Sequence, residues 1–253
     1  MFEKLIKPAE KQFRIKIYKL LQQHTNSIIS RFKAIYIDKK EDKKTDEEEA
    51  EELSENITDN IYIAEGTQTM FKELLPLYLN IEEISEEFFY NIHYVAADNR
   101  VQGIINDSYL KWLDNYAATQ IKRINRTTRE ETKRVIKDGL LQGKTYSEMA
   151  EDLQSDFKEY NKTRANTIAS TECHNVFMAN EDYIAKKTGF KYKKWISSRD
   201  ASVRPSHQLL DGKIVKIDEE FKPGLAYPGD YRAPAKEVVR CRCVLKYLIN
   251  KDD

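Results

Sequence analysis

Apolar residues are arranged differently before and after residue 189. Before it, they recur every three or four positions over long stretches, which is the spacing of an amphipathic helix. This pattern covers four stretches: residues 1–37, 60–79, 82–94 and 107–124. Pro76 lies inside the second stretch and is expected to break or kink it. The chain is therefore predicted to be mainly helical up to residue 188.

Capping signals divide the rest of this helical region. Thr128–Glu131 has the capping-box form, in which the Thr hydroxyl bonds an N–H three residues on and the Glu reaches back. It predicts a helix that begins near Arg129 and ends at Gly143. A shorter helix is expected to start in TYSEMAEDL, and a last long helix to cover residues 162–188.

After Gly189 the apolar runs become short, β-branched or aromatic, and are separated by turn residues. The runs FKYKKWI, KIVKI and VLKYLI are expected to be antiparallel strands. The predicted fold class is α+β, with a long, mainly helical N-terminal region followed by a small mixed domain over residues 189–253.

Composition narrows the class of protein. Charged residues make up 33% of the 253 residues, and the mean hydropathy is -0.70. The apolar runs are too short to span a membrane, and the N-terminus has no apolar core of a signal peptide. Three cysteines do not make a disulfide framework, which favours folding in a reducing cytosol.

Net charge is zero overall but uneven along the chain. Residues 1–37 carry eight Lys/Arg against two Glu, whereas residues 38–59 carry four Lys against eleven Asp/Glu. The acidic stretch has little to bury, so we expect a linker or an exposed helix there. The basic ends indicate either solvated faces, which we favour, or contact with a polyanion.

Basic residues also recur at helical spacing at Lys122, Arg126, Arg129, Lys133 and Lys137. Such a stripe can track phosphates, but the interleaved acidic residues favour a solvated face. If the chain binds double-stranded DNA, we expect weak and non-specific phosphate contacts. The expected contact residues are Lys122, Arg126, Arg129, Lys133, Lys191, Lys193 and Lys194.

A polar loop carries the strongest candidate chemistry. Asp200, Arg204, His207 and Asp211 lie within twelve residues, between two predicted strands. One interpretation is a site with His207 as base, a carboxylate that orients it and an arginine that holds an anion. The other, which we favour, is a self-bonded polar loop, because no nucleophile stands beside the histidine.

Cys241 and Cys243 lie two residues apart, and on one face if the chain is extended there. With His207 they could ligate zinc, but a structural zinc site normally has four Cys or His ligands. Cys173 and His174 are adjacent on a predicted helix and point in different directions, so they cannot easily join. We therefore expect no metal or cofactor, with zinc on His207, Cys241 and Cys243 as the alternative.

The C-terminal sequence resembles the phage Mu F-like minor head proteins, the head morphogenesis proteins of tailed phages and prophages. The resemblance covers about residues 164–248, from RANTIASTEC to VVRCRCVLKY. The matching residues, expected to form a structural network, are Arg164, Glu172, Trp195, Asp200, Arg204, His207, Asp211, Gly212, Cys241, Arg242 and Cys243. Many family members have Cys-x-x-Cys where this chain has Arg204-Pro-Ser-His207, so this chain lacks their four-thiol set.

The helical patterns and the resemblance together predict a domain organisation and a function. The long amphipathic patterns predict a helical assembly arm over residues 1–120, with a charged linker near 38–59, and the resemblance implies that residues 121–253 are the minor head protein module. The implied function is that of a structural, non-enzymatic capsid component, built into the procapsid beside the portal. The alternative is a metal-assisted hydrolase, nuclease or transferase that uses His207, Asp200, Cys241 and Cys243.

The same resemblance implies partners and a location. The partners would be the portal protein, the scaffold or the major capsid protein, with non-specific contact to DNA. The protein would be made in the bacterial host cytoplasm and end in the interior of the virion head. It would act in head morphogenesis, and its further roles would be DNA packaging and ejection of the genome.

Overall fold

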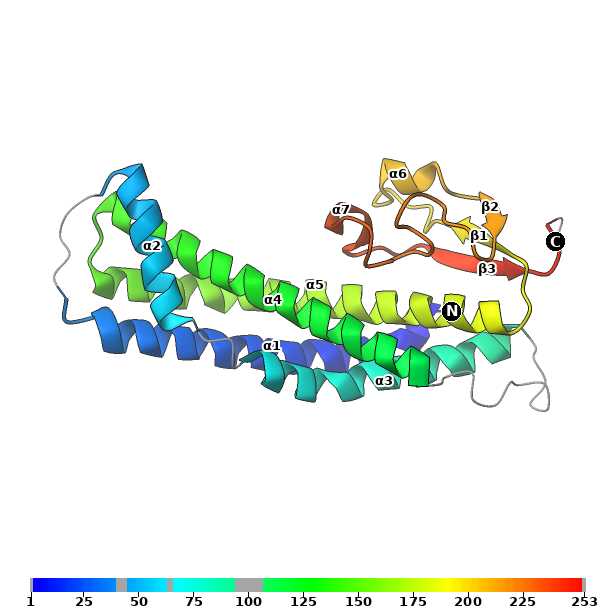
Figure 1. The fold of residues 1–253 in the computed structure, drawn as a ribbon, viewed down its shortest axis with the longest axis horizontal. Coiled ribbons are helices and arrows are strands. Elements are labelled where there is room, and N and C mark those ends of the chain that lie inside the picture. The colour runs from blue at the N-terminus through cyan, green and yellow to red at the C-terminus, as the bar shows by residue number, and fades with distance from the viewer. Residues whose placement is uncertain (1, 40–44, 63–65, 94–106, 252–253) are drawn as a thin grey trace. The chain divides into compact units, whose positions relative to one another are not determined.

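The computed structural model describes residues 2–39, 45–62, 66–93 and 107–251, where five long helices precede a short mixed segment (Figure 1). The helices are α1 (Phe2–Tyr36), α2 (Glu47–Ile61), α3 (Gly66–Ile92), α4 (Asp107–Gln142) and α5 (Tyr146–Lys187). The mixed segment contains β1 (Tyr192–Ile196), α6 (Pro205–Gln208), β2 (Ile214–Lys216), α7 (Ala235–Val238) and β3 (Val244–Leu248). This order confirms the predicted α+β class.

The chain forms two compact units that alternate along the sequence. Unit 1 comprises Met1–Arg14, Pro76–Trp112 and Thr167–Asp253, and unit 2 comprises Ile15–Leu75 and Leu113–Asn166. All three strands belong to unit 1, whereas α1, α3, α4 and α5 each contribute residues to both units. The strands therefore share their unit with helical segments from distant parts of the sequence.

Unit 2 has an apolar core of residues spaced at helical intervals on α1, α2, α4 and α5. Its fully buried members include Phe32, Ile61, Ile136 and Leu153. The acidic helix α2 buries one face in this core, and its carboxylates form ion pairs with cations of α4. These ion pairs link Arg129 to Glu55 and Asp59, Lys133 to Glu51 and Glu55, and Lys137 to Glu47 and Glu51.

The predicted helix boundary at Thr128 is wrong. α4 continues through it, and the buried Thr128 hydroxyl donates to the Ile124 carbonyl at 3.2 Å instead of capping a new helix. A true capping box forms at Thr145, whose backbone N–H and hydroxyl donate to Glu148 at 2.8 and 2.9 Å. From there α5 runs unbroken to Lys187, so the two helices expected between 146 and 188 are one.

Pro76 does not end a helix either. It lies inside α3, which joins the two stretches predicted over 60–79 and 82–94. A proline removes one hydrogen bond from a helix interior, so packing on both sides must compensate for it. The neighbouring Leu74 and Tyr78 are fully buried.

None of the described helices has both the length and the apolar character that a membrane crossing requires.

Unit 1 contains an antiparallel three-stranded sheet in the order β2-β1-β3. The central strand pairs Trp195 with Leu245 on β3 and Lys194 with Ile214 on β2. Alternate residues of β1 are buried, and Trp195 is fully buried in the core of this unit. The three predicted strands are therefore confirmed.

Candidate functional site

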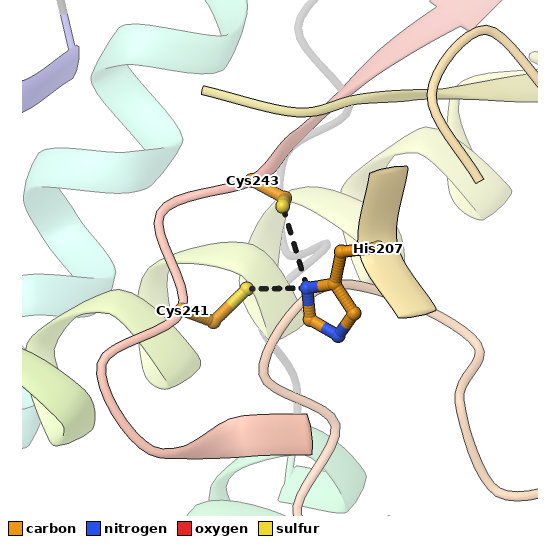
Figure 2. Close-up of side chains that lie close together, drawn as sticks. All are labelled: His207, Cys241 and Cys243. Atoms are coloured by element: carbon orange, nitrogen blue, oxygen red, sulfur yellow. Dashed lines mark hydrogen bonds between the residues drawn. The ribbon is translucent and has the colours of Figure 1, made fainter. Parts of the chain in front are cut away.

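Three buried side chains of unit 1 converge at one point (Figure 2). His207 lies on α6, and Cys241 and Cys243 lie between α7 and β3. The Nδ1 atom of His207 is 3.6 Å from Sγ of Cys241 and 3.5 Å from Sγ of Cys243. His207 is 1% exposed and each cysteine 3%, so the cluster is closed to solvent.

Local backbone structure explains this convergence. Pro205 at the first position of α6 favours a short helical turn, and the Arg204 carbonyl accepts from the N–H of His207 at 2.9 Å. Before the cysteines, Arg240 adopts a left-handed conformation with φ of 54°, and its N–H donates to Thr171 Oγ1 at 3.1 Å. This bend directs the Cys241–Cys243 segment toward α6.

A second layer of residues holds the imidazole ring. Nε2 of His207 lies 3.0 Å from Oε2 of Glu237, and the Ser206 hydroxyl donates to the same oxygen at 2.8 Å. The indole ring of Trp195 packs edge-on against the imidazole, with ring centroids 5.1 Å apart. The ring is therefore fixed on three sides, with Nδ1 facing the thiols and Nε2 facing a carboxylate.

The electrostatics favour an ionised thiol at Cys243. A hydrogen bond from Cys241 lowers the pKa of Cys243 against the effect of burial, and His207 adds to this. The same pair interaction, together with burial, raises the pKa of Cys241. Burial opposes ionisation of Glu237, but the Ser206 hydrogen bond and the charge of Lys222 outweigh it and lower its pKa. The cluster thus places a thiol and a carboxyl group, each with a lowered pKa, on opposite sides of one imidazole.

The carboxylates of the polar loop have partners other than His207. Asp200 pairs with Arg242, 2.8 Å from its guanidinium, and accepts the N–H of Ser202. Asp211 accepts the N–H of Ser197 at 2.8 Å and the side chain of Arg199 at 3.0 Å. These contacts fix the loop between β1 and β2.

Two other residues of this loop donate hydrogen bonds to backbone carbonyls of neighbouring segments. The guanidinium of Arg204 donates to the carbonyl of Val239, which links the start of α6 to the end of α7. Gly212 adopts φ of +80° where the chain turns back into β2, and its N–H donates to the Trp195 carbonyl at 2.8 Å. The Arg204 contact brings together the segments that carry His207 and the cysteines, and the Gly212 contact joins the end of the loop to β1.

Two more residues of the matching set lie on α5 and bind partners outside the cluster. The half-buried Arg164 belongs to unit 2 and donates to the Thr128 hydroxyl at 2.7 Å and to the Ile124 carbonyl. Glu172 belongs to unit 1, where it accepts a hydrogen bond from Tyr78 at 3.1 Å. Both bind partners from other helices, so each ties α5 to its own unit.

The basic residues expected to contact DNA fall into different environments. Lys193 is fully buried and donates to Asp182 at 3.0 Å, so its assignment to a DNA-contacting surface is wrong. Arg129 and Lys133 each hold two carboxylates of α2. The exposed members are Lys122, Arg126 and Lys191, and Lys194 is half-buried.

Glu237 and Ser206 were not predicted as site residues, and His174 was considered only as a ligand that could not easily join the cluster. His174 places Nε2 2.8 Å from the Cys243 carbonyl and so fixes the backbone of the thiol segment. Glu237 and Ser206 look like ordinary surface residues in AKEVV and RPSHQ. The available signal was that Ser206 and Glu237 lie close in sequence to His207 and Cys241. Closeness in sequence does not show where a side chain points.

Comparison with known protein families shows which proteins this chain resembles. Residues 130–246 match the family described as "Phage Mu protein F like protein". The match covers less than half of the chain, so it shows that this segment is similar to the Mu F-like proteins. The resemblance found in the sequence is confirmed, and the match begins at residue 130, inside α4, so it extends further toward the N-terminus than residues 164–248.

Several curated proteins are similar to the chain. Over 124 residues it is 36% identical to "Minor head protein GP7" of Bacillus phage SPP1, covering 46% of this chain and 39% of that protein. Over 202 residues it is 26% identical to "Uncharacterized protein YqbB" of Bacillus subtilis (strain 168), covering 75% of this chain and 64% of that protein.

A third relative carries the name of an enzyme. The chain is 29% identical over 177 residues to "NAD(+)--arginine ADP-ribosyltransferase EFV" of Enterococcus faecalis (strain ATCC 700802 / V583). This match covers 63% of this chain and 36% of that protein. The chain thus spans between about a third and two thirds of the length of these relatives. No solved structure matches it significantly.

Proposed function

We propose that the chain is a minor structural component of the head of a tailed phage or prophage. The observation that carries this proposal is the Mu F-like module at residues 130–246, together with 36% identity to a minor head protein. The buried cluster supports it, since a ring that is 1% exposed holds two chain segments together and is closed to a substrate.

In this proposal the protein acts in head morphogenesis beside the portal. Its partners are the portal protein, the scaffold or the major capsid protein, and it resides in the head interior after synthesis in the host cytoplasm. Roles in DNA packaging and genome ejection belong to the same proposal. The supporting feature is an N-terminal helix with apolar side chains on its outside: Leu5 is 43% exposed, Ile15 58% and Ile35 40%.

The enzymatic alternative is less well supported. A general base must reach its substrate, and His207 is enclosed by Trp195, Glu237 and the two cysteines. Asp200 is engaged by Arg242. The transferase name belongs to a relative of which this chain matches 36%. We expect purified protein, incubated with NAD⁺ and arginine-containing acceptors, to transfer no ADP-ribose.

Incorporation into heads tests the proposal directly. The gene would be tagged in the phage or lysogen that carries it, and heads would be separated on a density gradient. We expect the full-length chain to sediment with assembled heads, at a copy number well below that of the major capsid protein. A chain found only in the unassembled fraction, with normal infectivity after deletion of its gene, would refute the proposal.

Removing the first helix is a poor test of the assembly arm, because α1 contributes to the cores of both units. Phe13 is fully buried in unit 1 and Phe32 in unit 2. A surface change is cleaner: Ile15→Asp on the arm should lower incorporation into heads. Leu209→Asp is the matched control, since Leu209 is 84% exposed on the module, and it should leave incorporation unchanged.

A further inference from the structure

We propose that His207, Cys241 and Cys243 bind one zinc ion. Their ligand atoms all lie within 4.8 Å of one another, and all three side chains are buried. Imidazole nitrogen and thiolate sulfur are the donors that zinc takes in proteins, usually in a tetrahedron.

The distances fit the edges of such a tetrahedron. With Zn–S near ~2.3 Å and Zn–N near ~2.0–2.1 Å, a tetrahedral angle places nitrogen and sulfur about 3.6 Å apart. The observed Nδ1–Sγ distances are 3.6 Å to Cys241 and 3.5 Å to Cys243. An ion can therefore enter between the three atoms without a large movement of the backbone.

A single hydrogen bond at Nδ1 does not explain why both sulfur atoms lie close to it. Nδ1 has one in-plane position, so it can bear one proton or accept from one donor. Yet both sulfur atoms lie at similar distances from this one nitrogen. A cation at the centre satisfies all three donors at once, which a single hydrogen bond cannot do.

The surroundings are those of a metal-bound histidine. Ligand histidines commonly direct the other ring nitrogen at a carboxylate, which fixes the tautomer and the ring orientation. Here Nε2 of His207 faces Oε2 of Glu237 at 3.0 Å, and Ser206 holds that oxygen at 2.8 Å. A proton on Nε2 leaves the lone pair of Nδ1 free to bind the ion.

Charge balance favours a divalent ion at this depth. Two thiolates neutralise Zn²⁺, so the loaded centre carries no net charge among buried side chains. The described residues supply three ligands, and we assign the fourth position to a water molecule. The ion would join α6 to the segment before β3, closing a loop of chain between residues 207 and 241.

Metal content of the full chain, without a histidine tag, tests the site. We expect about one zinc per chain by mass spectrometry of the purified protein, retained through gel filtration. Replacement with Co²⁺ should give the visible absorption of a tetrahedral ion with a thiolate-to-metal charge-transfer band. Metal-free protein that takes up no Co²⁺ under reducing conditions would overturn the proposal.

Variants separate this site from adventitious binding. Cys243→Ser and His207→Ala should lose the zinc and the Co²⁺ spectrum, whereas Cys173→Ser, which changes a buried thiol outside the cluster, should keep both. Glu237→Gln should keep the stoichiometry but weaken zinc affinity about 10- to 100-fold.

If the first two variants fail to fold, competition with a chelator in wild-type and Glu237→Gln protein still gives the affinity ratio. Zinc retained by Cys243→Ser, lost equally from Cys173→Ser, or held equally by Glu237→Gln would contradict the assignment.

Discussion

Lys193 and Asp182 form an ion pair inside unit 1, with 3.0 Å between Nζ and Oδ1 and neither side chain more than 3% exposed. Lys186 approaches the other carboxylate oxygen of Asp182 at 2.6 Å. The central strand β1 is thereby tied to α5 by charge as well as by the apolar core. The pair fixes the strand to the helix that precedes it in the chain.

Breaking this pair from the lysine side should be costly. In Lys193→Met a buried carboxylate loses its main partner, and we expect a loss of about 3 kcal/mol in the free energy of unfolding, moderated by Lys186. Lys193→Met combined with Asp182→Asn should recover part of the loss. Lys194→Met, half-buried and next in sequence, is the control and should cost far less. Denaturant unfolding measures the free energy of unfolding of all three variants. Equal losses of stability in Lys193→Met and Lys194→Met would contradict this explanation.

Glu181 should make stability fall as pH rises. Burial raises the pKa of Glu181 to about 8, so the unfolded chain, with an ordinary pKa, releases this proton first. Its contribution is unfavourable from about pH 4.5 upward and levels off above about pH 8, reaching at most about 5 kcal/mol. Burial also raises the pKa of Glu82, to about 7, which adds to the same trend.

The change Glu181→Gln should therefore raise the free energy of unfolding at pH 8 and leave it nearly unchanged at pH 4.5. Glu151→Gln, exposed on the same helix, should have little effect at either pH. Thermal unfolding between pH 4.5 and 8.5 gives both curves. A steeper decline with pH in Glu181→Gln than in wild type would show that the carboxylate is ionised and stabilising.

Alanine substitutions at two glycines with similar φ angles separate the cost of backbone strain from the cost of side-chain crowding. Gly229 has φ of +83°, and an added Cβ would lie 2.2 Å from Oδ1 of the buried Asn175. Gly189 has φ of +87° with nothing within 4 Å of that position. Both alanine variants incur the left-handed backbone cost of about 1–2 kcal/mol. Only Gly229→Ala adds about 1–3 kcal/mol of overpacking, so it should unfold at lower denaturant than Gly189→Ala.

The sequence predicted the element types better than their ends. The three strands were predictable because FKYKKWI, KIVKI and VLKYLI are short apolar runs bounded by turn residues. The break at Thr128 was not real, because the residue is buried and its hydroxyl bonds the helix backbone and Arg164. Local cap patterns cannot show which residue will be buried by a helix from elsewhere in the chain.

The cluster was only partly predictable, for a similar reason. His207, Cys241 and Cys243 stood out because their side chains are uncommon and chemically distinctive. Glu237 did not, because its importance comes from the turn of α7 that places it 3.0 Å from His207. The same limit applied to Lys193, which looked like one cation among several and is buried by its pairing with Asp182.

DNA binding gives the last prediction, with the contributing residues narrowed by the structure. We expect at most weak, sequence-independent binding that falls steeply with salt, because phosphate contacts release counterions. Lys122→Ala with Arg126→Ala should weaken binding at low salt and flatten the salt dependence. Arg129→Ala with Lys133→Ala, which removes the same charge from residues already paired with α2, is the matched control and should change binding less. Titrations of unrelated duplexes at several salt concentrations measure both. Tight binding to one sequence, or equal losses from the two double variants, would show that the duplex contacts a different surface.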